Sequence, residues 1–486
     1  MTSIRASYEQ IFYPSFPRQA TAPDRLAAVA TLFGLATPDP QTARVLEIGC
    51  SDAGNLMALA VATPRGRFLG IDFSRPAIER GRERARELGL TNLELQERDL
   101  TEFPAESGTF DYIIVHGVLS WVPAAVAEQL LALVRRHLAP EGIAYIDYNA
   151  QPGSQLRYAF RESILFHVRR FAEPQQQVDQ ARSLLKLIID ANAEGSVQRM
   201  MAEQELRNLL RTPDAAVFHD MLGQENHPFF FHEFAAVAAR HGLEYLGEAD
   251  VFEMSDVLLP AAIRERLAGL RGIIDKEQYL DILRSRVFRQ TLLCHAGRAI
   301  SRALDGETLR ALFFSAAGEV APGEREDEVA VRRSFGTMST TNPLVKAVVA
   351  LLTEVTPARL DFAELAAEVQ RRHPDLAGTV EAALPMTLAH ATMSGMVNIH
   401  ASPANFTTEI AAQPVASALA RIQAARGEAL FTLNHSQVKP DKAVREILPL
   451  LDGTRDQAEL ARALDCDPAE VEQTLRAVAR HALLVK

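Results

Sequence analysis

The amino-acid sequence predicts an α/β fold whose first third forms a doubly wound, mostly parallel sheet. Short apolar runs of strand length alternate five times with stretches of helical periodicity within the first 150 residues. The first run is almost continuously apolar and ends at Gly49, as is typical of a strand buried on both faces. Ser74 is a suitable N-cap for a later helix, with Pro76 in its first turn. Expected strands span residues 44–49, 68–72, 93–98, 110–116 and 143–148, and expected helices span 55–62, 74–88 and 126–138.

Length and composition place the chain among multidomain globular proteins. It has 486 residues, of which 48% are hydrophobic and 23% charged, and this length exceeds one ordinary domain. The sequence contains only three cysteines, which excludes a disulfide framework and is typical of a reducing cytoplasm. No apolar stretch approaches the roughly 18 residues that a membrane helix needs, and the first residues do not resemble a secretory signal. We therefore expect a cytoplasmic protein without membrane insertion.

The charge balance argues against a nucleic-acid partner. The chain carries 51 basic and 62 acidic residues, a net charge of −11, whereas nucleic-acid binders usually show a basic footprint. The basic residues of 80–86 alternate with apolar positions at helical spacing, which indicates a solvated helix face. A negative net charge is compatible with a cationic partner.

The pattern changes after residue 150. Residues 154–210 are helical in periodicity, residues 228–251 are expected to form strand, helix and strand, and residues 255–312 are again helical. We expect the strands of 228–251 to close the first sheet. Residues 319–327 are polar and contain Pro322 and Gly323, so a linker is expected there. Two helix-rich stretches that follow, residues 343–400 and 442–486, are compatible with small winged-helix-like units.

The loop after the first strand carries the clearest chemical signal. Read as a dinucleotide fingerprint, it has Ser51 in place of the middle glycine, between Gly49 and Gly54. That middle glycine allows the backbone to touch a pyrophosphate, and a serine β-carbon would crowd it. The loop therefore favours a nucleoside ligand without phosphates over NAD.

Three carboxylates stand at or near the carboxyl ends of the first three expected strands. Asp72 ends the second strand, where a carboxylate can accept hydrogen bonds from both hydroxyls of a ribose. Asp99 follows the third strand, where it could accept from the exocyclic amino group of a base; the alternative is a turn or N-cap residue before Thr101. Together with Glu47 in the first strand, they indicate a nucleoside site.

Several motifs resemble class I S-adenosylmethionine-dependent methyltransferases. These are VLEIGC at 45–50, Asp72, Arg98 with Asp99, and LAPEG at 138–142. Further segments resemble a bacterial subgroup in which a methyltransferase regulatory domain follows, and whose characterised members include rickettsial protein-lysine methyltransferases that modify surface proteins. Those segments are residues 13–26, 49–56, 116–123, 148–153, 218–222, 228–234, 279–293 and 451–455.

The resemblance implies S-adenosylmethionine as cofactor, bound at a Rossmann-like methyltransferase sheet. Glu47 and Gly49 would face its methionine part, Asp72 its ribose, and Asp99 with Leu100 its adenine. Ser51 replaces the second glycine of the family motif, so the shape of the loop stays open. The expected cofactor contacts are Glu47, Gly49, Cys50, Ser51, Gly54, Asn55, Asp72, Phe73, Asp99, Leu100 and His116.

We expect the methyl acceptor at the ends of the fourth and fifth strands. His116 could accept or relay a proton, or be a strand-end histidine bonded to backbone. Trp121, the only tryptophan, could hold a cation against its ring, or anchor the next helix. Tyr148 and Asn149 are expected to face the same crevice, unless they only form a turn.

Other residue groups are less informative. Tyr8 and Tyr13 could close an N-terminal lid over the sulfonium, or simply pack there. Metal binding is not expected: the spacing of His219, His227 and His232 fits no standard zinc pattern, and an aromatic-rich structural segment is favoured. The arginines of 284–289 are expected to form internal ion pairs, and Cys50 is not expected to be a nucleophile.

The predicted function is methyl transfer to lysine or another amine of a protein or peptide. The accessory regions, more than half of the chain, exceed what a small acceptor would need. The alternatives are a small-molecule or natural-product methyltransferase and a non-catalytic, cofactor-binding regulatory protein, whereas Ser51 disfavours an NAD oxidoreductase. A homo-oligomer through the helical insertion is compatible with this organisation. The expected domains are a methyltransferase core at 1–153, a helical insertion or cap at 154–215, a regulatory or middle domain at 216–318, and a helix-rich C-terminal domain at 319–486.

Overall fold

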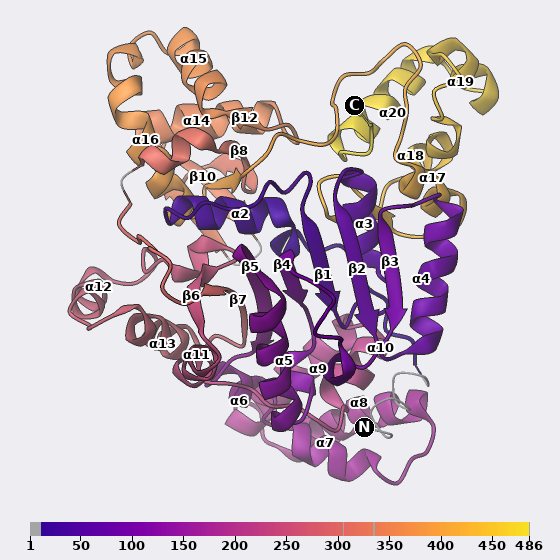
Figure 1. Ribbon diagram of the computed structural model, residues 1–486, viewed down its shortest axis with the longest axis vertical. Coiled ribbons are helices and arrows are strands. Elements are labelled where there is room, and N and C mark those ends of the chain that lie inside the picture. The colour runs from indigo at the N-terminus through magenta and orange to yellow at the C-terminus, as the bar shows by residue number, and fades with distance from the viewer. Residues whose placement is uncertain (1–10, 305, 334–335, 486) are drawn as a thin grey trace.

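A twisted seven-stranded sheet organises the computed structural model, which describes residues 11–304, 306–333 and 336–485. Its strand order is β3-β2-β1-β4-β5-β7-β6, and the first five strands are parallel (Figure 1). This arrangement confirms the predicted doubly wound α/β class. The strands are β1 (Arg44–Ile48), β2 (Arg67–Asp72), β3 (Leu93–Glu97), β4 (Phe110–Val115), β5 (Leu138–Asn149), β6 (Leu243–Glu248) and β7 (Phe288–His295).

Apolar strands and amphipathic helices explain the layers of this unit. Val45, Leu46 and Ile48 of β1 are all buried, because helices cover both faces of the parallel strands. The side chains of β1 divide between two hydrophobic clusters, with Val45 on one face and Leu46 on the other. The surrounding helices are α2 (Pro23–Leu32), α3 (Gly54–Ala62), α4 (Arg75–Glu87), α5 (Ala124–His137) and α11 (Phe231–Arg240).

The closing strands of the sheet differ from the sequence prediction. The expected strand at residues 228–231 is reduced to one bridge between Phe229 and Ala150, and α11 begins at Phe231. The strand expected near the end of residues 228–251 is confirmed as β6, which forms the edge of the sheet. Between β5 and β6 lies β7, which runs antiparallel to both and comes from a region expected to be helical. Pairing on both sides overrides the local helical pattern that α12 (Ala261–Ala268) and α13 (Ile273–Arg284) follow.

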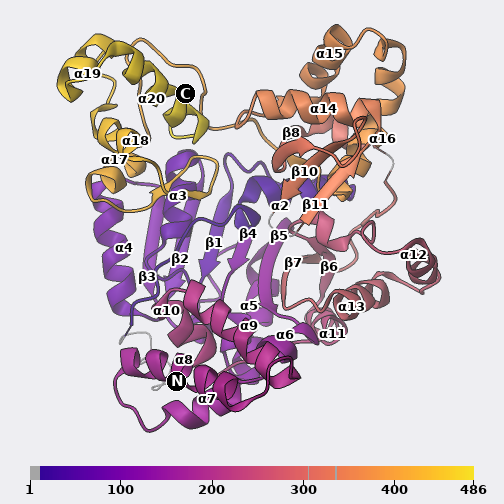
Figure 2. The same ribbon diagram turned by 180° about the vertical axis from the view of Figure 1, so that it is seen from behind.

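A layer of helices lies beside the carboxyl ends of the parallel strands, at the bottom of Figure 1 and Figure 2. It has its own hydrophobic cluster, which includes Ile164, Val178 and Phe218. The predicted helical character of 154–210 is confirmed, and the layer continues to residue 221. Its elements are α6 (Gly153–Arg157), α7 (Arg161–Val168), α8 (Pro174–Ala191), α9 (Val197–Arg211), α10 (Asp214–Ala216) and the π-turn η4 (Val217–Met221).

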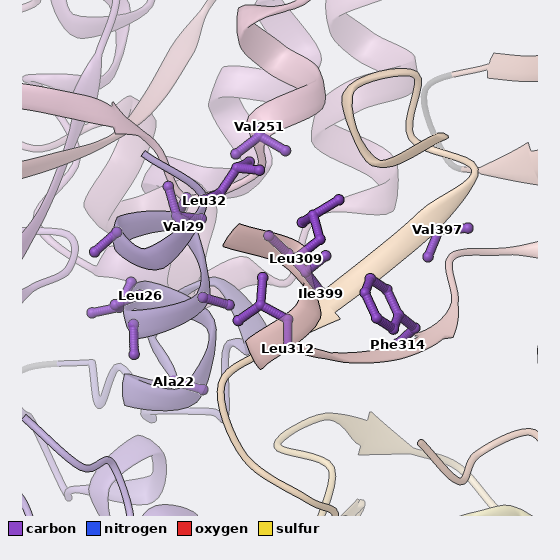
Figure 3. Close-up of a cluster of buried hydrophobic side chains, with 14 of the residues drawn as sticks. Ala22, Leu26, Val29, Leu32, Val251, Leu309, Leu312, Phe314, Val397 and Ile399 are labelled. Atoms are coloured by element: carbon purple, nitrogen blue, oxygen red, sulfur yellow. The ribbon is translucent and has the colours of Figure 1, made fainter. Parts of the chain in front are cut away.

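A second unit packs against α2 near the amino ends of the strands. Strand β8 (Phe313–Ala316) pairs with β12 (Leu360–Asp361) and β13 (Val397–His400), and three helices cover this small sheet. Figure 3 shows the apolar side chains of α2 facing this unit, with Leu26, Val29 and Leu32 opposite Leu309, Leu312 and Ile399. The helices are α14 (Pro343–Glu354), α15 (Phe362–Arg372) and α16 (Ala377–Met393).

The linker expected at residues 319–327 is wrong. Residues 319–322 form β9 (Glu319–Pro322), which pairs with β10 (Val329–Arg333), and β10 in turn pairs with β11 (Gly336–Thr340). Pro322 and Gly323 instead lead into the turn between the first two of these strands. The polar composition reflects an exposed hairpin rather than an unstructured connection.

The last part of the described chain has a core of its own. Buried residues of this core include Leu448, Leu460 and Leu475. The unit contacts the first sheet through α17 and α3, near the top of Figure 1. Its elements are α17 (Ala418–Ala425), β14 (Leu430–Phe431), β15 (Gln437–Val438), α18 (Lys442–Ile447), α19 (Gln457–Leu464) and α20 (Pro468–Arg480).

A buried ion cluster fastens β7 to its neighbours. The side chain of Arg289 is fully buried and donates to Glu248 Oε1 at 2.8 Å, Glu277 Oε2 at 2.6 Å and Asp281 Oδ2 at 2.9 Å. These carboxylates come from β6 and α13, so a single guanidinium joins three elements. Its planar fork of donors suits this arrangement.

Two further arginines complete the predicted arginine group. Arg286 adds ion pairs to Asp281 at 3.2 Å and to Glu253 at 3.2 Å. The expectation of internal ion pairs is therefore confirmed for Arg286 and Arg289. Arg284 instead donates to the backbone carbonyls of Glu253 and Ser255.

We predict that Arg289→Met lowers the free energy of unfolding by about 3–5 kcal/mol, because it leaves the buried carboxylates of Glu277 and Asp281 without their main partner. Urea unfolding followed by circular dichroism measures the change. The matched control is Arg476→Met, which removes an exposed ion pair to Glu472 and should change stability by no more than about 0.5 kcal/mol. Equal effects of the two substitutions would contradict the role given to the cluster.

Candidate active site

The loop after β1 turns sharply and is bonded to β2. The backbone N–H groups of Gly49 and Cys50 both donate to the carbonyl of Ile71, at 2.8 and 3.1 Å. Gly49 has a φ of 78°, and a β-carbon there would lie 2.5 Å from Val118 Cγ2, so glycine is required. The loop ends at Gly54, the first residue of α3.

Ser51, which departs from the glycine of the family motif, anchors the N-terminal segment that we define as residues 11–18. Its Oγ donates to the carbonyl of Tyr13 at 2.6 Å, and its backbone N–H donates to Asp72 Oδ2 at 2.9 Å. Gly54 is needed for the same approach, because a β-carbon there would lie 2.1 Å from the carbonyl oxygen of Ser15. The N-terminal segment thus lies directly over the loop.

Asn55 is fully buried and connects four parts of the chain. Its Nδ2 donates to Glu47 Oε1 at 3.0 Å. Its Oδ1 accepts from the backbone N–H of Arg18 at 3.1 Å, from Thr21 Oγ at 3.2 Å and from His435 Nε2 at 2.8 Å. The Oδ1 of Asn55, a residue expected to touch the cofactor, is therefore already occupied by three protein donors, and its Nδ2 is engaged with Glu47.

Glu47 is the best-defined acceptor for a ligand cation. It is buried, its Oε1 is bonded to Asn55, and its Oε2 has no partner among the described residues. Burial raises the pKa of Glu47 to about 8. A neighbouring ammonium group would favour the ionised carboxylate, so this residue fits a ligand that brings a positive charge.

The other expected cofactor residues lie at the same edge of the sheet. Asp72 accepts from the backbone N–H groups of Ser51 and Ser74, which fixes its carboxylate at the end of β2. Asp99 caps the turn η2 (Leu100–Glu102), with Oδ1 accepting from Thr101 N and Oγ, as the alternative interpretation held, and its Oδ2 stays available.

The remaining expected cofactor residues differ in how deeply their side chains are buried. Phe73 and Leu100 are half-buried at the ends of their strands. The Cys50 side chain is fully buried and faces β2, where its Sγ would lie 2.7 Å from a β-carbon on Gly70. Only the backbone of Cys50 is therefore placed to meet a ligand.

His116 and Asp147 form a hydrogen-bonded pair where β4 and β5 end. His116 Nδ1 is bonded to Asp147 Oδ2, while Asp147 also accepts from Gly117 N at 2.7 Å and from the Tyr145 hydroxyl at 3.0 Å. Burial alone would lower the pKa of His116, but the carboxylate of Asp147 outweighs it and the net shift is upward. The side chain of His116 is 27% exposed and that of Asp147 1%.

The other residues expected to contact the methyl acceptor lie in different surroundings. Tyr148 is wrong as a crevice residue, because its side chain is buried in the core with its ring 4.3 Å from that of Phe234. Asn149 bonds to Ser120 Oγ through its backbone N–H and to Asn226 through its amide. Trp121 is half-buried at the end of the turn η3 (Leu119–Trp121).

The N-terminal segment meets the helical layer above this pair. Tyr13 contacts the ring of His219 edge-on at 5.4 Å, while Tyr8 lies outside the described residues. Asp220, in the same π-turn, interacts electrostatically with Tyr13, and burial raises the pKa of Asp220 to about 6. Burial likewise raises the pKa of Tyr13 to about 12.

Sequence reasoning missed Asp147 and Asp220 as site residues. Asp147 lies inside the fifth predicted strand, and its alternation with buried neighbours gives no sign of its partner. Asp220 stands in the aromatic-rich segment that was interpreted as structural. Its signal is the π-turn, a geometry often found at functional sites, which no local sequence pattern revealed.

The described residues hold neither a cluster suited to a metal ion nor a helix suited to cross a membrane. No group of three or more histidine, cysteine, aspartate or glutamate side chains suited to a metal ion occurs among them. None of the helices in residues 11–304, 306–333 and 336–485 has the length and apolarity required to cross a membrane.

Three family models match the chain. A methyltransferase domain matches residues 45–142, a predicted methyltransferase regulatory domain residues 213–295, and a PKMT C-terminal winged helix domain residues 412–481. The first covers the loop after β1 and the ends of β1, β2, β3 and β4, and the second covers β6 and β7. The fold and its site are those of a class I S-adenosylmethionine-dependent methyltransferase, with S-adenosylmethionine as the cofactor.

Whole-chain similarity gives the particular family. An uncharacterised protein of Rickettsia prowazekii is 32% identical over 75% of this chain and 68% of its own length, and a shorter one is 33% identical over 50% and 97%. PKMT2 from Rickettsia typhi is 26% identical, with a TM-score of 0.86 over 98% of this chain and 100% of that one. Its complex with S-adenosylhomocysteine gives a TM-score of 0.84. The chain belongs to this rickettsial-type methyltransferase family, with its regulatory and winged helix domains.

We predict that Ser51→Gly loosens the N-terminal segment without unfolding the protein. The change removes the bond from Oγ to Tyr13, worth about 1 kcal/mol, while glycine accepts the φ of 52° at this position more easily. Hydrogen exchange should show about fivefold lower protection of the Ser15 and Arg18 amides, by that same bond energy. Ser74→Ala, at the same sheet edge, is the control and should leave those amides unchanged. Unaltered protection in Ser51→Gly would show that another contact holds the segment.

Proposed function

We propose that this methyltransferase transfers the methyl group of S-adenosylmethionine to a lysine amine of a protein or peptide. The observation that carries the proposal is the pair of His116 and Asp147, at the strand ends beside the cofactor loop. An amine acceptor needs such a base, since a protonated amine has no lone pair and a lysine pKa is about 10.4 in water. The name of the similar solved protein, PKMT2, supports the same acceptor class.

The cofactor would be held by residues already fixed at this edge. Glu47 Oε2 is suited to its ammonium group, Asp72 to its ribose hydroxyls, and Asp99 with Leu100 to its adenine. Gly49 and Ser51 would approach it through backbone. When bound, it supplies a sulfonium methyl group: a nitrogen–carbon bond forms as the carbon–sulfur bond breaks, leaving S-adenosylhomocysteine.

His116 is proposed to take the proton of the acceptor. Because Nδ1 is bonded to Asp147, Nε2 is the nitrogen left to face the acceptor ammonium. Asp147 holds the imidazole in this tautomer and stabilises the imidazolium that forms, and Gly117 and Tyr145 hold Asp147. These three residues position the base, which the reaction requires because the protein mainly aligns the acceptor nitrogen with the methyl carbon.

The rim of the crevice suits a cationic side chain. Asp220 lies close enough to His116 for the two to interact electrostatically, and it remains partly ionised near neutral pH because its pKa is about 6. Trp121, at the end of η3, is proposed to contact the acceptor cation or the aliphatic part of its side chain. The net charge of −11 favours approach of a basic acceptor.

We predict that Asp147→Asn lowers kcat/KM by about 100-fold or more, because the amide stabilises the wrong imidazole tautomer. Without the carboxylate, burial alone acts on His116 and its pKa falls. The rising limb of kcat/KM against pH, which reports neutral His116, should therefore move to lower pH. Initial rates with a lysine peptide substrate between pH 5 and 10 measure both effects.

Two further variants are compared in the same experiment: His116→Gln, which removes the proposed base, and Asn149→Ala, which is the control. His116→Gln should abolish the limb that Asp147→Asn moves, whereas Asn149→Ala removes a nearby amide bond to Asn226 and should leave the position of the limb unchanged. A limb that stays at the same pH in all three variants would show that the acceptor alone titrates, and would reject His116 as the base.

The acceptor class is tested by labelling. We predict that the enzyme with methyl-labelled S-adenosylmethionine transfers label to the high-mass fraction of a bacterial extract, and that acid hydrolysis releases it as methyl-lysine. The His116→Gln variant is the background control. Label confined to the low-mass fraction would reject a protein acceptor, and label released as another methylated amino acid would reject lysine.

A further inference from the structure

A second cavity lies away from the candidate active site, at the amino ends of β1 and β2. Its volume is about 350 Å³, which is in the range of small-molecule sites. Four parts of the chain line it: α2 with the segment before β1, the end of α3 with the start of β2, the small sheet of β8 and β13, and the turn after β14. The proposed function makes no use of this cavity.

Arg25 of α2 lines this cavity without a partner of its own. Its guanidinium makes no hydrogen bond and no ion pair within the described ranges, although other buried arginines of the protein are paired. It is only half-buried, so its nitrogen atoms remain accessible. Burial lowers the pKa of Arg25, which indicates that its charge is poorly solvated.

The carboxylates nearest to Arg25 are committed to other groups. Asp24 accepts from Arg359 Nη1 at 2.9 Å and from His400 Nδ1 at 2.8 Å. Asp250 is paired with Arg333 at 2.5 Å. The guanidinium groups of Arg25, Arg333 and Arg359 therefore share two carboxylates, those of Asp24 and Asp250. Burial lowers the pKa of His400 to about 3, so its imidazole is neutral. One positive charge is left over beside the cavity.

The remaining walls offer hydrogen-bonding groups. Gln41, Asn398, Asn405 and Asn434 contribute amides, and Thr63 contributes a hydroxyl. Apart from the imidazoles of His400 and His435, Phe68 is the one aromatic side chain on the wall among the described residues, so the lining favours a polar ligand over a flat apolar one. An uncompensated guanidinium in a partly dry site is costly unless an anion completes it.

We propose that this cavity binds a small organic anion, whose carboxylate or phosphate pairs with Arg25. Guanidinium binds either group through two parallel N–H···O bonds. The amides on the opposite walls would bond to the hydroxyl or carbonyl groups of the same molecule. The ligand would bridge the methyltransferase sheet and the two units beyond it, because residues of all three line the site.

Calorimetric titration of the full chain tests this site with three probes: inorganic phosphate, ribose 5-phosphate and succinate. At least one probe should bind the unmodified protein, and Arg25→Gln should weaken that binding by about tenfold or more. The phosphate probes and succinate distinguish the two sources of charge. Arg65→Gln is the matched control, an exposed arginine near the same edge, and should bind as the unmodified protein does.

A second variant keeps the test independent of the charge change. Ala317→Leu fills space on the cavity wall while Arg25 is retained, and it should also weaken binding of the probe. Without any anion, Arg25→Gln should not lower the melting temperature, because it removes a poorly solvated charge. Absence of binding by all three probes, or unchanged affinity in both Arg25→Gln and Ala317→Leu, would overturn the proposal.

Discussion

The rest of the structure depends on the buried amide of Asn55. Its Nδ2 holds Glu47 at the end of β1, while its Oδ1 accepts from the N-terminal segment and from His435 of the last unit. A buried amide is stable only when its donors and acceptors are satisfied. The cofactor loop, the N-terminal segment and the C-terminal unit must therefore be in place together. Asn55 and His435, which lie 380 positions apart in the sequence, thus help to position the acidic group that is proposed to meet the cofactor.

Buried charges mark the other joints between distant segments. Arg289 joins β7 to β6 and α13, and Asp24 joins α2 to Arg359 and His400 of the second unit. Such groups add little net stability compared with apolar residues, but each is severely destabilising when one partner is missing. They therefore select one arrangement of the units over others. Arg25 stands out against this pattern, because its own partner is absent from the described residues.

The candidate active site places two kinds of acid at neighbouring strand ends. Glu47 is buried with one free oxygen, which suits a ligand cation, whereas Asp147 is fully engaged in orienting His116. The carboxylate group is thus suited to a binding role at one position and a positioning role at the other, according to its hydrogen bonds. The N-terminal segment contacts the cofactor loop through Ser51 and the helical layer through His219, so it links the loop to that layer.

The sequence by itself determined the sheet, the cofactor edge and the class of enzyme. Strand periodicity is a local signal, and the ends of parallel strands meet at one edge, so Glu47, Asp72 and Asp99 could be placed together before any contact was known. Only the tertiary structure decided that β7 lies between β5 and β6, that residues 319–322 form a strand, and that Asp147 rather than Tyr148 bonds to His116. These features depend on partners far along the chain, which local patterns do not encode. The unpaired charge of Arg25 belongs to the same group, since the lack of a partner is visible only when every neighbour has been placed.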